Sequence, residues 1–160
     1  RGTYALAETN ITEGNDPTQG GFFASDTLVG FEIPRVAKHS ATLTGEYSTN
    51  WGDSQKEVYL RADGIYNTGR LMQLQNIVQT PDSFVLNARV GFRTDQYDFS
   101  IFGRNLTDED AATNAFRYVG LRNSGRSFAN LNNNSLFRRG NNVAFLRRGL
   151  QVGARLVYNF

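Results

Sequence analysis

Arginine is concentrated toward the carboxyl end of the chain. Residues 111–160 contain eight arginines and no acidic residue, whereas residues 1–110 contain nine basic and fifteen acidic residues. Guanidinium groups form charge-assisted, often bidentate hydrogen bonds with carboxylates and phosphates. The segment therefore predicts an affinity for anions, with Arg138 and Arg139 as candidate ligand contacts. The alternatives are contacts with phosphate groups of a surrounding surface, or solvation; nucleic acid is not an expected partner, because a groove-reading motif and spaced aromatic residues are lacking.

Few other side chains are of types that carry out catalysis or bind metals. The chain has no cysteine and one histidine, His39, which follows Lys38 in a polar stretch and is expected at the solvated surface. Asp108, Glu109 and Asp110 could supply oxygen ligands to a hard cation, but we expect a solvated turn. Neither a nucleophile with a partner base nor a pair of catalytic carboxylates can be assembled. We therefore expect no enzyme activity, no cofactor and no bound metal.

Strands must position these side chains, because alternation of apolar and polar residues is the dominant pattern. Aromatic residues make up 12% of the chain and glycine accounts for 16 of 160 residues, which favours strands and turns. Period-two segments predict six strands, at 2–10, 36–50, 56–70, 84–93, 97–106 and 149–160. The length fits one domain, so the expected fold is all-β, an antiparallel up-and-down meander.

The connections between the predicted strands alternate in length. Those at 11–35, 71–83 and 107–148 are long, and those at 51–55 and 94–96 are short. Alternate connections of an up-and-down meander lie at the same end of the sheet, so the long loops should share one end and the tight turns the other. Outer-membrane β-barrels have short turns on one side and long loops on the other. The long connection at 107–148 is expected to lack regular structure.

The two side-chain parities of the last five predicted strands differ in charge. One parity has no Asp, Glu, Lys or Arg, and it comprises Ala41, Leu43, Gly45, Tyr47, Val58, Leu60, Ala62, Gly64, Tyr66, Leu86, Ala88, Val90, Phe92, Tyr97, Phe99, Ile101, Gly103, Leu150, Val152, Ala154, Leu156, Tyr158 and Phe160. The other parity holds Glu46, Asp98 and the candidates for lining a water-filled interior, which are Arg61, Asp63, Arg89, Arg93, Arg104 and Arg155.

The medium that meets the uncharged parity is not decided by alternation alone, since a soluble β-sandwich shows the same pattern. Aromatic residues near the strand ends, such as Tyr47, Tyr66 and Tyr158, are typical of the interfacial girdles of membrane barrels. No apolar run approaches the roughly 18 to 20 residues that a membrane-spanning helix needs. These observations favour about six strands of a transmembrane outer-membrane β-barrel.

Three stretches resemble the end of the barrel of TonB-dependent receptors of Gram-negative outer membranes. EVYLRADGIYNTGR, at 57–70, resembles a strand that rises to a loop. FVLNARVGFRTDQYDFSIFGRNLTDED, at 84–110, resembles the penultimate hairpin with its GRNLTD ending, and RRGLQVGARLVYNF, at 147–160, resembles the closing strand. The resemblance covers about residues 36–160. Such barrels have 22 strands, so residues 1–160 are expected to be the carboxyl-terminal part of the barrel domain, without the plug domain and the remaining strands.

The resemblance also implies a function and partners. It implies energised uptake of a scarce, bulky ligand across the outer membrane, most often siderophore-bound iron, with cobalamin and oligosaccharides as alternatives. The implied partners are the energy-coupling TonB complex (through a region amino-terminal to this chain), outer-membrane lipid and lipopolysaccharide, the barrel-assembly machinery and a ligand such as a ferric siderophore. The signal that the assembly machinery reads would be Val152, Ala154, Leu156, Tyr158 and Phe160. Two alternatives from other classes are a passive porin-like channel and a soluble carbohydrate-binding β-sandwich.

Overall fold

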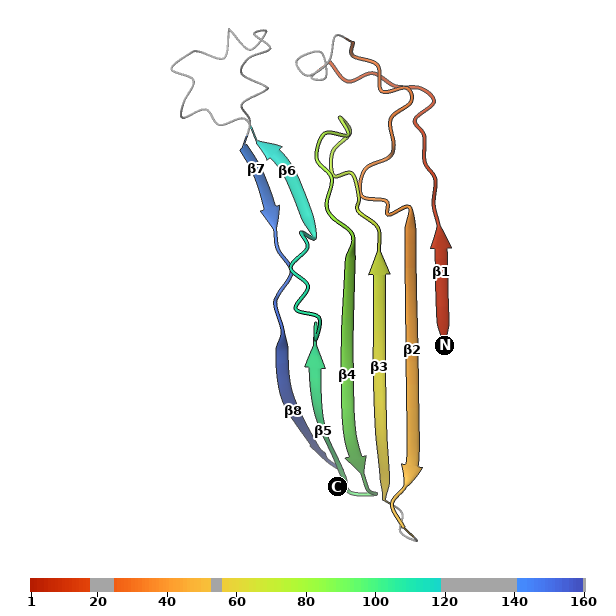
Figure 1. The fold of residues 1–160 in the computed structure, drawn as a ribbon, viewed down its shortest axis with the longest axis vertical. Helices are drawn as coiled ribbons and strands as arrows, with labels where there is room; N and C mark the ends of the chain where they lie inside the picture. The colour runs from red at the N-terminus through yellow and green to blue at the C-terminus, as the bar shows by residue number, and fades with distance from the viewer. Residues whose placement is uncertain (18–24, 53–55, 119–140, 160) are drawn as a thin grey trace.

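The computed structural model describes residues 1–17, 25–52, 56–118 and 141–159, and no helix occurs among them. Six strands form one antiparallel sheet in the order β1-β2-β3-β4-β5-β8. They are β1 (Gly2–Leu6), β2 (His39–Asn50), β3 (Glu57–Asn67), β4 (Ser83–Arg93), β5 (Tyr97–Arg104) and β8 (Gln151–Tyr158). The sheet is open, with β1 and β8 as its two edges (Figure 1).

The predicted all-β class and the six-stranded antiparallel order are confirmed. The strand ends differ from the predicted ranges by a few residues, most at β1, which stops at Leu6 instead of residue 10. The reason is pairing: Leu6 lies opposite His39, the first residue of β2, so residues after Leu6 have no strand to pair with. The segments after β1 and β3 lie at one end of the sheet, which we call the loop end, and the turn between β4 and β5 lies at the other, the turn end (Figure 1).

The expectation of an irregular connection at 107–148 is wrong for its described part. β6 (Asn114–Tyr118) and β7 (Asn141–Phe145) form a separate two-stranded antiparallel sheet beyond the ends of β5 and β8 (Figure 1). The rings of Phe116 and Phe145 pack with their centroids 6.1 Å apart. Cross-strand aromatic contacts of this kind stabilise a ribbon, which explains why these short segments pair.

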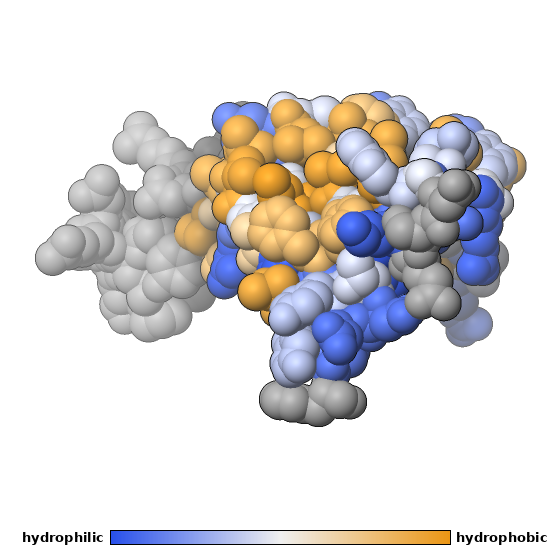
Figure 2. Space-filling model, turned by 90° about the horizontal axis from the view of Figure 1, so that it is seen from below, coloured by the Kyte–Doolittle hydropathy of each residue, from blue (hydrophilic) through white to orange (hydrophobic). Residues whose placement is uncertain are grey.

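The strand register places those residues of the uncharged parity that lie within strands on one face of the sheet. Val58 lies opposite Phe92, which lies opposite Phe99, and Phe99 lies opposite Leu156. Since residues that face each other across an antiparallel pair point to the same side, these side chains share a face. We call it the uncharged face, and the opposite one the polar face. Figure 2, viewed from the turn end, shows hydrophobic residues gathered on one side and hydrophilic residues along another.

Large side chains of the uncharged face are not covered by other parts of the described chain. Leu43, Val90 and Val152 are 69%, 48% and 70% exposed. The buried apolar residues lie elsewhere, with Met72, Val78 and Ala115 forming a cluster at the loop end. The uncharged face is therefore a continuous apolar surface that the described residues leave exposed. Exposed apolar patches of this kind mark contact with a partner or with lipid.

Glycine lets aromatic rings approach the backbone of neighbouring strands closely on the polar face. A Cβ on Gly153 would stand 2.6 Å from the Phe102 ring, and one on Gly91 would overlap the ring of Tyr59. Tyr59 is consequently buried although it projects from the polar face. These two ring-on-glycine contacts provide packing on a face that otherwise carries charge.

Candidate functional site

The polar face brings together the six residues that the sequence predicted for a water-filled interior. Arg61 of β3 lies opposite Glu46 and Arg89, and Arg93 of β4 lies opposite Glu57 and Asp98. Arg104 and Arg155 project from β5 and β8 on the same side, and Asp63 lies opposite Asn87. The register shows that these residues share one face of the sheet. That this face lines a water-filled interior stays a prediction.

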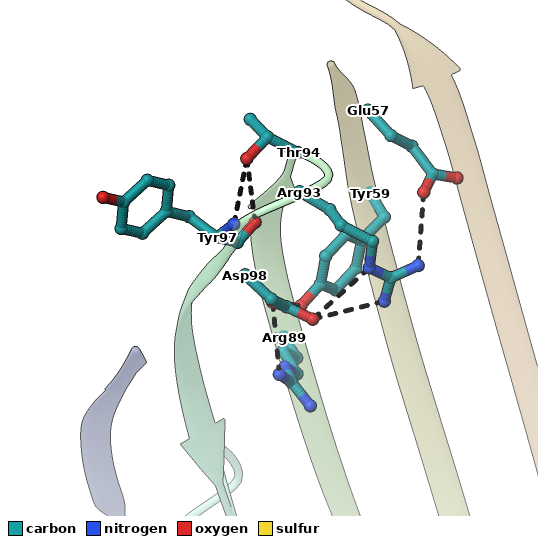
Figure 3. Close-up of polar contacts among 7 residues, drawn as sticks. All are labelled: Glu57, Tyr59, Arg89, Arg93, Thr94, Tyr97 and Asp98. Atoms are coloured by element: carbon teal, nitrogen blue, oxygen red, sulfur yellow. Dashed lines mark hydrogen bonds and ion pairs between the residues drawn. The ribbon is translucent and has the colours of Figure 1, made fainter. Parts of the chain in front are cut away.

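One group of polar residues lies at the turn end and comprises Glu57, Tyr59, Arg89, Arg93 and Asp98, which we call the turn-end cluster (Figure 3). The Arg93 guanidinium donates to Glu57 at 3.2 Å and to Asp98 at 3.3 Å, thereby joining three strands. The buried Tyr59 hydroxyl donates to Asp98 at 2.9 Å. Figure 3 shows the Tyr97 side chain pointing away from this cluster.

Two guanidinium groups of this cluster contact the Tyr59 ring. Their Cζ atoms lie 5.0 Å (Arg93) and 5.6 Å (Arg89) from the ring centroid, within cation–π range. Arg93 is thus held by two carboxylates and a ring. Its contacts join β3, β4 and β5.

A second group of polar residues surrounds a shallow hollow of about 420 Å³ in the middle of the polar face. We call it the arginine hollow, and it is lined by Arg61, Asp63, Asn87, Ala88, Arg89, Phe102, Gly103, Arg104 and Arg155. Asp63 is the one acid of this lining. Its carboxylate already accepts hydrogen bonds from the Arg61 guanidinium at 3.2 Å and from the Thr44 hydroxyl at 2.8 Å.

The four arginines of the hollow differ in how well they are paired. Arg61 has Asp63 and also Glu46, at 3.7 Å. Arg89 reaches Asp98 only at 3.8 Å, and its buried Nε has no hydrogen-bond partner among the described residues. Arg104 and Arg155 form no ion pair within the part of the chain that the structure describes; the Arg104 guanidinium lies 5.2 Å from the centroid of the Phe102 ring. The hollow therefore has an excess of positive charge.

The GRNLTDED stretch forms a structured junction where β4, β5 and β8 meet the loop end. The buried Asn105 donates to the carbonyls of Glu109 and Arg148, and its backbone N–H donates to Asn87. The Asp108 carboxylate accepts from the backbone N–H of Leu150 at 2.9 Å. Asn105 and Asp108 have positive φ angles of 52° and 48°, which Asn and Asp tolerate better than most residues.

Asp108 and Asp110 of the expected solvated turn at 108–110 are exposed, and Glu109 is half-buried. The Glu109 carboxylate accepts hydrogen bonds from the backbone N–H groups of Phe84 and Ala111, both at 2.9 Å. These bonds, with that from Phe84 the strongest, hold the pKa of the Glu109 carboxyl below its usual value. Asp108 and Glu109 therefore connect the segment after β5 to the backbone next to β8 and in β4.

The remaining predicted residues lie in three places. His39, expected at the solvated surface, is partly exposed, and its Nδ1 is hydrogen-bonded to the Tyr4 hydroxyl at 2.8 Å. Arg138, Arg139 and Phe160 lie outside the described residues. The other proposed members of the assembly signal lie on the uncharged face of β8, as shown by their pairing with β5; they are Val152, Ala154, Leu156 and Tyr158.

Sequence reasoning did not find the turn-end cluster as a unit or the junction around Asn105. The cluster could have been predicted if the strand register had been known, because Glu57, Arg93 and Asp98 form one row across three strands. The sequence gives a weaker indication of the role of Asn105. It is an Asn directly after a strand, and Asn tolerates the left-handed backbone conformation that turns use.

Within the described residues, no helix is long and apolar enough to cross a membrane. The same part of the chain contains no group of three or more His, Asp or Glu residues arranged to hold a metal ion. Comparisons of the chain with protein-family models, with curated protein sequences and with solved structures find no match in any of the three.

Proposed function

We propose that this chain is the carboxyl-terminal part of the barrel of a TonB-dependent outer-membrane receptor and that its uncharged face contacts lipid. The protein would take up a scarce, bulky ligand with energy supplied from the inner membrane, and siderophore-bound iron is the substrate class that we infer. The single observation that carries the membrane part is the exposed apolar face between two groups of aromatic residues.

The aromatic residues of the uncharged face gather at its two ends. Near the loop end, one row across four strands contains Tyr4, Ala41, Tyr66 and Phe84, of which three are aromatic. The turn end carries Phe92 and Phe99, which lie opposite each other, and three tyrosines, Tyr47, Tyr97 and Tyr158. Rings of Tyr97 and Tyr158 are in contact, with centroids 5.0 Å apart. Residues between the two groups are aliphatic or small.

The spacing of the two aromatic groups matches a bilayer. Phe84 and Phe92 are eight positions apart on β4, which is about 26 Å at roughly 3.3 Å per residue. A strand tilted by about 40° then separates the two groups by about 20 Å of depth, against an apolar band of roughly 25 Å between the girdles of outer-membrane barrels. The polar face would line the interior, where charged side chains meet water.

The energised-uptake part of the proposal is supported by the resemblance of 57–70, 84–110 and 147–160 to the end of such receptor barrels. On this proposal, the TonB complex, the barrel-assembly machinery and lipopolysaccharide are partners. The open edges at β1 and β8 support a place in a larger sheet, because unpaired strand edges in hydrocarbon cost several kcal/mol per polar group.

Single-cysteine labelling tests the membrane part. The chain has no cysteine, so Val90→Cys and Ser48→Cys can each carry one environment-sensitive fluorophore. Val90 projects from the uncharged face, and Ser48 lies at a similar level of the sheet on the polar face, since they pair with Leu60 and Tyr59. Lipids brominated in their acyl chains should quench the label at position 90 and leave that at position 48 bright. Equal fluorescence of both labels in such bilayers would reject lipid contact.

Uptake experiments test the transport part and separate it from a passive channel. Cells that depend on this protein should lose uptake of ferric siderophore when a protonophore collapses the inner-membrane gradient. Uptake that persists after the gradient is removed would identify a porin-like channel. A control substrate that enters through general porins should be unaffected.

A further inference from the structure

We propose that the arginine hollow is a binding site for a small ligand that carries two or more anionic groups, either carboxylates or phosphates. The site lies on the polar face of the sheet, and its lining residues differ from Arg138 and Arg139, which the sequence suggested as ligand contacts. It depends only on the polar face, so it holds whatever medium meets the uncharged face.

The arrangement of charge is the first argument. Arg61 and Arg89 lie directly opposite each other on adjacent strands and project from the same face. Like charges in directly opposite positions destabilise a sheet. Arg61 is paired with Asp63 and Glu46, whereas Arg89 has only Asp98, at 3.8 Å. An anion between the strands would offset the remainder.

The availability of donors is the second argument. Arg104 and Arg155 are exposed and have no ion pair within the described part of the chain. They project from adjacent strands β5 and β8, on either side of the row in which Phe102 faces Gly153. Two guanidinium forks in such positions suit two separate anionic groups of one ligand, because each fork binds a carboxylate or phosphate in bidentate fashion. A ligand with a single charge would engage only one of them.

The size and floor of the hollow are the third argument. About 420 Å³ lies within the range of small-molecule sites, roughly 300–1,000 Å³. The Phe102 ring, which lies close to Gly153, contributes an apolar surface between Arg104 and Arg155. The hollow thus combines charged rims with an apolar base, which suits a compact organic polyanion better than a hydrated monovalent ion.

The test measures binding of two probes, propane-1,2,3-tricarboxylate and inorganic pyrophosphate, to the full chain by isothermal titration calorimetry at low ionic strength. Both probes should bind, and acetate should bind at least tenfold more weakly. The double variant Arg104→Gln/Arg155→Gln should weaken probe binding by tenfold or more. Both side chains are exposed and form no ion pair with a described residue, so the fold should be retained, as checked by circular dichroism.

A matched control removes two positive charges elsewhere. Lys56→Gln/Arg70→Gln lies outside the hollow and should change probe affinity less than twofold. Equal losses in the two double variants would show a general effect of net charge and overturn the site. The absence of probe binding to the unmodified chain would overturn it as well. The labelling at positions 48 and 90 reports on lipid contact independently, so failure of either proposal can be recognised without the other.

Discussion

Arginine introduced on the uncharged face of β4 should destabilise the protein in a bilayer by an amount that depends on depth. Leu86, Ala88 and Val90 point to this face, and Ala88 is four residues from both Phe84 and Phe92. If the two aromatic groups mark the interfaces, Ala88 lies near the bilayer midplane. Leu86 and Val90 then lie about 5 Å of depth to either side, given roughly 3.3 Å per residue and a tilt of about 40°.

The expected magnitudes follow from these positions. Arginine at a lipid-facing midplane position costs about 2–4 kcal/mol, and the cost falls to about 0–1 kcal/mol near the interfaces. Ala88→Arg should therefore cost about 2–4 kcal/mol, and Leu86→Arg and Val90→Arg about 1–2.5 kcal/mol each. Ser48→Arg, on the polar face of β2 next to Glu46 in the same parity, should cost less than about 0.5 kcal/mol.

Urea unfolding of the protein reconstituted in lipid vesicles measures these costs, followed by fluorescence of Trp51, the one tryptophan of the chain. Thicker bilayers should raise the cost at Leu86 and Val90 toward that at Ala88, because both positions then lie deeper in hydrocarbon. A soluble sandwich would cover the same face with protein and show no dependence on lipid thickness. Equal costs at all three positions, or costs that are independent of lipid, would refute the depth argument.

Removal of the Tyr59 hydroxyl by Tyr59→Phe should cost about 2 kcal/mol in urea unfolding, because the Asp98 carboxylate loses a buried donor; Tyr47→Phe, exposed on the other face, should be near neutral. Glu109→Gln should remove a pH dependence: the folded-state pKa of Glu109 is lowered, so its stabilisation is complete above about pH 4.5 and is lost as the pH falls through that lowered pKa. Unfolding curves of both proteins between pH 3 and 6 should converge at the acidic end, and parallel curves would contradict the assignment. Phe160→Asp should lower the amount of heat-modifiable barrel in outer-membrane fractions, whereas Asn159→Asp should not; normal levels of the first variant would reject an assembly role.

The strands and their faces could be predicted because each segment carries its own period-two signal. Alternation in 56–70 or 84–93 fixes which residues share a side, and one face then follows for the whole sheet once neighbouring strands pair in register. The observed pairs Leu60 with Val90 and Val90 with Ile101 join the parities that the sequence assigned to one side. Barrel closure has no such local signal, and the described sheet is open.

The ribbon of β6 and β7 could not be predicted in the same way. Each strand is five residues long, and β7 begins with two asparagines, which are depleted in strands. Their pairing depends on contacts across a long stretch of chain, such as that between Phe116 and Phe145. A local pattern does not report contacts of this range.

The polar face shows the limit of composition as a guide to charge. This face has enough acidic residues and arginines to suggest that most arginines form ion pairs. The strand register, however, places the acids beside some arginines and not beside others. Arg93 gains two carboxylates because Glu57 and Asp98 flank it in one row. Arg89 lies between Arg61 and Phe102 in its own row, where the one acid, Glu46, is opposite Arg61. A shift of one residue in the pairing of β4 with β5 would move Asp98 to the opposite face. The charge excess of the hollow is therefore a property of the sheet register.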